Sequence, residues 1–134
     1  SGADAVVTRA ISFGSIDLHP GGDIFTIAAS GGSAVPVASF NSVVTGGHSG
    51  LITVTSQAVE HVDITYPASV TLTSSPYTIQ MGSINTHSQY SVGGTDTLGG
   101  GIPLLINVGG RINIPSGQAH GSYTAIVAIV LNFS

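Results

Sequence analysis

The sequence contains no cysteine, and this absence excludes several kinds of chemistry. Without a thiol the chain has no disulfide framework, no thiolate metal site and no cysteine nucleophile, and its redox compartment stays undetermined. Tryptophan is also absent, and only four tyrosines are present. An aromatic platform for stacking on sugar rings therefore has few residues from which it could be built.

Charged side chains are scarce as well. They make up 6% of the 134 residues, with no lysine, two arginines and six acidic residues, whereas a typical soluble domain carries about 25%. Two arginines do not form the basic patch that neutralises phosphates, so the composition argues against nucleic acid as a partner. So few charges also oppose self-association weakly. The chain is either a small β domain that tolerates a nearly neutral surface or, as we favour, a subunit covered by copies of itself.

Long hydrophobic runs are missing too. The longest apolar stretch, Ala125 to Leu131, is far shorter than the roughly 20 residues that a membrane-spanning helix needs. We therefore expect no membrane span. No signal peptide is visible and the first residue is Ser1, so we expect a mature or trimmed chain, with Ser1-Gly2 equally well a remnant of cloning. The length fits one domain with a real core.

What the sequence does contain is a series of short β patterns separated by glycine and proline. Expected strands lie at 3–8, 11–18, 24–29, 51–55, 60–66, 70–72, 77–81, 103–108, 111–114 and 122–133, with an edge piece at 35–40 that contains Pro36. No helical period is sustained. Short strands at this spacing predict an all-β fold, an antiparallel β-sandwich.

Local sequence patterns give four more specific predictions. The apolar positions change parity across Gly14, which predicts a β-bulge or bend there. The segment 60–66 alternates, with Val62 and Ile64 inward. Gly109-Gly110 is expected to separate two strands. The polar, glycine-rich segment 82–101 is expected to hold at most an edge strand near Tyr90 and Val92.

The last strand pattern is apolar on both faces. One face contains the odd-numbered residues from Tyr123 to Phe133, and the middle of the other face contains Ile126, Ala128 and Val130. Since successive side chains point to opposite sides of a sheet, the second face needs a partner of its own. We therefore assign Ile126, Ala128 and Val130 to subunit packing.

No constellation of catalytic residues is evident. The glycines do not form a dinucleotide or phosphate-binding motif, and no nucleophile elbow is present. Two pairs could place metal ligands on one strand face, Asp17-x-His19 and His61-x-Asp63, but neither has a third ligand placed, and exposed polar positions explain them better. We predict a protein that is not an enzyme and uses no metal or cofactor.

The C-terminal pattern resembles a known bacterial family. Gly109-Gly110-x-Ile112-x-Ile114-Pro115-x-x-Gln118-x-x-Gly121-x-Tyr123 resembles the closing signature of the Domain of Unknown Function 4402 family, and the segments 11–16 and 63–72 are similar to its opening and central strands. The resemblance implies an exported, Ig-like β-sandwich similar to fimbrial pilins, placed outside the cell. It implies no catalytic residues.

These observations favour a structural subunit of an extracellular bacterial filament. In the pilin mechanism, an incomplete sandwich is completed by a strand from a neighbour. We therefore divide the chain into an extension, 1–9, and a sandwich domain, 10–134. In the extension, Ala3, Ala5 and Val7 form the donor-strand face. The expected partners are copies of the chain and a secretion or assembly machinery.

One alternative of a different class stays open. A secreted adhesin or carbohydrate-binding module would be a self-contained sandwich with an exposed aromatic residue. Tyr90 is the tyrosine that we expect to be exposed, whereas Tyr66, Tyr77 and Tyr123 are expected to point inward.

Overall fold

The protein is built from β-strands. A computed structural model describes residues 4–37, 42–56, 60–74, 77–88, 94–98, 103–116, 121–125 and 130–133, and none of these residues lies in a helix. The strands are β1 (Asp4–Arg9), β2 (Ile11–Asp17), β3 (Gly22–Ile27), β4 (Val35–Pro36), β5 (Val43–Thr45), β6 (Gly50–Thr55), β7 (Glu60–Thr65), β8 (Val70–Ser74), β9 (Tyr77–Ser88), β10 (Gly94–Leu98), β11 (Leu104–Pro115), β12 (Gly121–Ala125) and β13 (Val130–Phe133).

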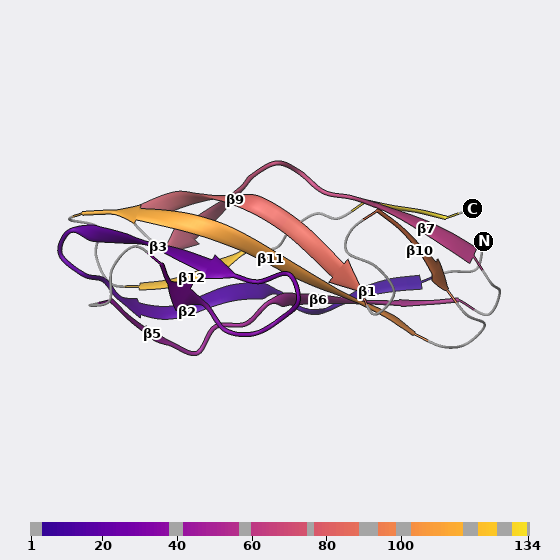
Figure 1. The fold of residues 1–134 in the computed structure, drawn as a ribbon, viewed down its shortest axis with the longest axis horizontal. Coiled ribbons are helices and arrows are strands. Elements are labelled where there is room, and N and C mark those ends of the chain that lie inside the picture. The colour runs from indigo at the N-terminus through magenta and orange to yellow at the C-terminus, as the bar shows by residue number, and fades with distance from the viewer. Residues whose placement is uncertain are drawn as a thin grey trace.

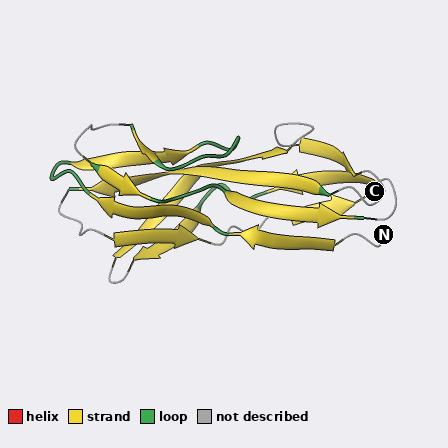
Figure 2. Ribbon diagram, turned by 90° about the horizontal axis from the view of Figure 1, so that it is seen from below, coloured by secondary structure: helices red, strands yellow, loops and turns green. Residues whose placement is uncertain are grey.

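The strands form two antiparallel sheets. The larger has the order β1-β6-β11-β9-β8-β12-β2-β5, with β3 also paired to β11 and β4 to β3, and the smaller has the order β10-β7-β13. The strands run mostly along the length of an elongated molecule, and the smaller sheet lies at the end where the chain termini and β1 also lie (Figures 1 and 2). The large sheet curls, and the whole is the antiparallel β-sandwich that the sequence predicts.

A single hydrophobic core joins the two sheets. Its largest fully buried side chains include Phe13, Phe25 and Met81 from the large sheet, and Val62 and Ile64 of β7 belong to the same cluster. His61, Asp63 and Thr65 of β7 are exposed, so the alternation predicted for this segment is confirmed. Val62 and Ile64 therefore attach the small sheet to the core.

Two bulges keep apolar residues directed inward. In β2, Ser12 and Ser15 pair with Thr124 and Ser122, so β2 has one extra residue at the bulge predicted near Gly14. Gly14 has a φ of 71°, a conformation that suits glycine. In β9 the buried positions shift from odd to even numbers after Met81, and the bulge there contains Ser83 with a φ of 48°.

The expected break at Gly109-Gly110 is wrong. β11 runs through both glycines, pairing with β6 and then β3 along one edge and with β9 along the other. A Cβ on Gly109 would overlap the backbone of Ile27, and one on Gly110 would lie 2.6 Å from Met81 Sδ. These glycines allow close packing rather than a turn.

The segment after Met81 also differs from the expectation. β9 continues to Ser88 and pairs with both β8 and β11, so it is an interior strand of the sheet. Tyr90 and Val92 lie outside the described residues. The predicted edge position of Pro36 is confirmed, since β4 pairs with β3 alone in the described part of the chain.

The expected C-terminal run contributes to both sheets. β12 pairs with β2 and β8 in the large sheet, and β13 pairs with β7 in the small one. Residues 126–129 lie outside the described part.

Candidate assembly site at the first strand

β1 lies at one end of the large sheet, where it pairs with β6 of the same chain. The register opposes Asp4 to Thr55, Ala5 to Val54, Val6 to Thr53 and Val7 to Ile52, and after a shift it opposes Arg9 to Leu51. The outer edge of β1 has no other partner among the described strands. β1 is therefore an edge strand, which is a template for pairing with another chain.

All six residues of β1 are exposed. Directly opposed residues in an antiparallel pair share a face, so Ala5 and Val7 lie on the core side of the sheet, beside the buried residues Val54 and Ile52. Val7 is nevertheless 54% exposed. The described part of the small sheet therefore does not cover the core side of β1.

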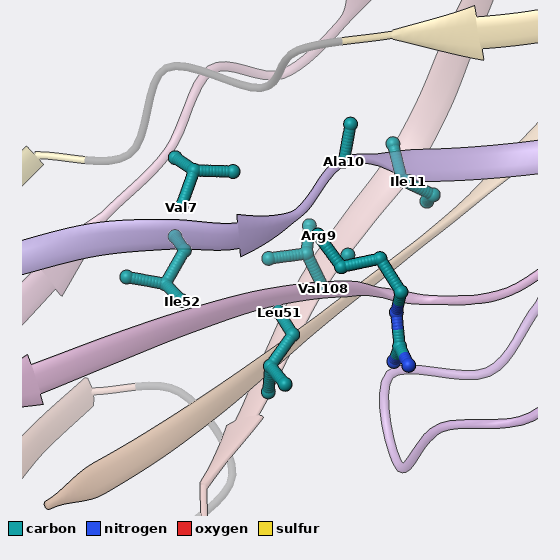
Figure 3. A pocket seen from close by; sticks show the side chains of 8 residues that line it. Val7, Arg9, Ala10, Ile11, Leu51, Ile52 and Val108 are labelled. Atoms are coloured by element: carbon teal, nitrogen blue, oxygen red, sulfur yellow. The ribbon is translucent and has the colours of Figure 1, made fainter.

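A shallow depression, open to solvent, lies where β1 meets β2. It is lined by Val7, Arg9, Ala10, Ile11, Gly50, Leu51, Ile52 and Val108. Figure 3 shows Val7 and Ile52 on adjacent strands and pointing to the same side, while the Arg9 side chain extends away toward a neighbouring loop. The lining is mostly apolar, which suits a hydrophobic side chain rather than a charged ligand.

Arg9 fastens the end of β1 to the start of β6. Its Nε donates to the carbonyl oxygen of Ser49 at 2.9 Å, and Nη2 donates to the Ser49 hydroxyl at 3.2 Å. That hydroxyl, which is fully buried, donates in turn to Oδ1 of Asn107 on β11 at 3.0 Å. Ser49 carries no local sequence signal for this role, because no motif marks a serine that contacts an arginine 40 residues away.

The second predicted assembly surface consists of Ile126, Ala128 and Val130, and the structure describes Val130. Val130 begins β13 opposite Thr65, and it is 54% exposed, whereas Leu131 packs against the core. The two faces of this strand are thus oriented as the alternation predicted. Ile126, Ala128 and, at the other end of the chain, Ala3 lie outside the described residues, so the structure does not place them beside Val130 or Val7.

Other kinds of site have little to support them in the described residues. No group of three or more His, Asp or Glu side chains could hold a metal ion there. Tyr90, on which the carbohydrate-binding alternative rests, is not described, and the Tyr66 hydroxyl donates to Asn85 Oδ1 at 3.0 Å. No helix suited to crossing a membrane occurs in the described part of the chain.

Comparison with known proteins places the whole sandwich in one family. No curated protein and no solved structure matches the chain. The family described as Domain of unknown function (DUF4402) matches residues 5–133, which includes nearly all of β1 as well as both sheets. The chain therefore belongs to the DUF4402 family.

Proposed function

We propose that the protein is a structural subunit of an extracellular bacterial filament, with an Ig-like, pilin-like sandwich that polymerises by β-strand complementation. The N-terminal segment of one copy adds a strand to the sheet of the next. Main-chain hydrogen bonds supply the affinity, and small or β-branched side chains supply the fit. Export to the cell surface by a secretion or assembly machinery is part of the proposal.

One observation carries this proposal. β1 has its core-side residues Ala5 and Val7 exposed, although the residues opposite them on β6 are buried. In a self-sufficient sandwich, the facing sheet covers the inner face of the strand that ends the other sheet. An inner face left open at an edge strand is the arrangement that a neighbouring copy can complete.

The rest of the surface agrees with this assembly. Val6 is 61% exposed on the outer face of β1, and Val130 is exposed on β13 of the small sheet. The small sheet and β1 lie toward the same end of the molecule (Figure 1). With two arginines, six acidic residues and no lysine, charge repulsion between copies is weak. Contacts in which one patch meets a different patch extend into fibres when the rotation between successive copies does not close a ring.

Electron microscopy of the purified protein, kept free of denaturant, tests the proposal. Uniform fibres with a regular repeat are expected. A density map at side-chain resolution would then show which copy contributes the strand beside each β6. Discrete, monodisperse particles over a wide range of concentration and salt would contradict the filament function.

A further inference from the structure

The connection between β1 and the rest of the chain is very short. Ala10 alone separates β1 from β2, yet the two strands have different partners: β1 pairs with β6, and β2 pairs with β12 and β5. Short connections of this kind favour the exchange of an element between copies, since a small change at the hinge redirects the whole strand. In this chain, a change in the backbone at Ala10 alone would redirect β1.

The contacts that hold β1 do not depend on which copy provides it. Its residues bury little surface because all six are exposed. It is held by the backbone ladder to β6, by a 2.7 Å hydrogen bond between the hydroxyls of Thr8 and Thr53, and by the Arg9 contacts with Ser49. Each of these partners lies on β6 or just before it. An identical strand from a second copy can form every one of them.

We infer that β6 is the acceptor strand of the polymer and that it receives β1 of a second copy in the register seen within one chain. This inference rests on the proposed function and adds the acceptor, the strand direction and the pairing to it. The occupant is the segment Asp4–Arg9 of another copy, antiparallel to β6, with the partner's Val6 opposite Thr53. This segment fits because the chain's own copy of it already occupies the same edge.

Two features define the register. Val7 lines the depression together with the buried residues Ile52 and Val108, so a donor strand in this register keeps an apolar side chain beside these two residues. Arg9 must also reach Ser49. A slip of one residue would turn the strand's faces over, and a slip of two would move Arg9 by about 6.8 Å, beyond hydrogen-bonding distance.

Cysteine cross-linking tests the acceptor directly, because the chain has no cysteine of its own. Chains carrying Val6→Cys and chains carrying Thr53→Cys, one of them isotopically labelled, are mixed in equal amounts, allowed to assemble, oxidised, and analysed by mass under denaturing conditions. Directly opposed residues lie close enough for a disulfide with small adjustment. We expect a mixed dimer joined between positions 6 and 53 as the main product.

Matched mixtures check the register of the pairing and the identity of the acceptor strand. Thr55→Cys replaces Thr53→Cys to test a two-residue slip, and Val43→Cys tests β5, the strand at the opposite end of the sheet order. Both should cross-link to Val6→Cys much less. A single chain with both Val6→Cys and Thr53→Cys, oxidised as a monomer, should hold β1 on its own β6 and form no fibres until it is reduced.

The outcomes separate the two proposals. Fibres without the mixed dimer between positions 6 and 53, or fibres from the oxidised double variant, would overturn the β6 acceptor and leave the filament function standing. No fibres from the unsubstituted chain under any condition would overturn the filament function and the exchange with it. Fibres with the mixed dimer, and with none from the oxidised double variant, would support both.

Discussion

The Arg9 side chain donates from Nε to the carbonyl oxygen of Ser49 at 2.9 Å, joining residues 40 positions apart. Ser49 is fully buried, and its hydroxyl donates a hydrogen bond to Asn107 Oδ1. One of the two arginines in the chain thus fastens an exposed edge strand to the interior of the sheet. The first strand is attached at its C-terminal end more firmly than its exposure suggests.

Ser49→Ala should weaken this attachment from the buried side. The variant removes the donor to Asn107 Oδ1 and one acceptor of Arg9, so the free energy of unfolding should fall by about 1–2 kcal/mol. Urea unfolding followed by circular dichroism measures this free energy.

Arg9→Gln should loosen the attachment of β1 while changing the core little, so amide hydrogen exchange should become faster in β1 alone. Equal protection of β1 in both variants and the parent would contradict this role.

Three glycine-to-alanine variants should differ in a fixed order. Gly109→Ala meets the backbone of Ile27, which cannot move aside, and should cost more than about 3 kcal/mol of unfolding free energy or prevent folding. Gly110→Ala meets Met81, a flexible side chain, and should cost about 1–3 kcal/mol. Gly82→Ala has nothing within 4 Å of the new Cβ and should change stability by less than about 1 kcal/mol.

The Gly110→Ala cost should shrink when Met81 is shortened. In a Met81→Ala background the clash is removed, so the double variant should lose less unfolding free energy than the two single variants lose together. Additive effects of Gly110→Ala and Met81→Ala would mean that Met81 is not what requires a glycine at position 110.

Ser83 should respond differently to glycine and to valine. Its φ of 48° lies in the left-handed region at the β9 bulge, where glycine is unstrained and a β-branched side chain is not. Ser83→Gly should be neutral or stabilising by up to about 1 kcal/mol, and Ser83→Val should destabilise by about 1–3 kcal/mol. Thermal unfolding of the pair checks the difference, and equal midpoints would argue against a strained bulge.

Deletion of residues 1–9 should abolish regular fibres and leave the sandwich folded. All the residues of β1 are exposed, so the core loses few contacts, although the uncovered edge of β6 favours aggregation over a soluble monomer in part of the material. A synthetic peptide of residues 1–10 should bind the truncated chain and raise its unfolding midpoint. Regular fibres from the truncated chain would refute the donor assignment of Ala3, Ala5 and Val7.

Val130→Ser should reduce assembly without affecting folding. Val130 is exposed on β13, so its loss should change the unfolding free energy by less than about 0.5 kcal/mol, while fibre growth followed by light scattering should slow. Val43→Ser on β5 is a control of similar exposure, at 57%. Equal slowing by both variants would mean that Val130 has no special part in subunit packing.

Much of the fold follows from local patterns in the sequence. Alternation at Val62 and Ile64 predicts β7 and its buried face, since the period of side chains along a strand is two. The change of parity at Gly14 predicts the bulge in β2 for the same reason. Pro36 predicts an edge position because proline lacks the N–H that an interior strand donates. These features depend on a few neighbouring residues, so one sequence is enough to find them.

Other features were decided by the tertiary structure, because they depend on partners distant in the chain. A glycine pair indicates either a turn or a close approach, and only the backbone of Ile27 and the side chain of Met81 distinguish the two at Gly109-Gly110. The division of the C-terminal run between two sheets depends on β2 and β7. Local patterns marked Ala5 and Val7 as one face of a strand, but the pairing with β6 that leaves them exposed on the core side required the whole sheet.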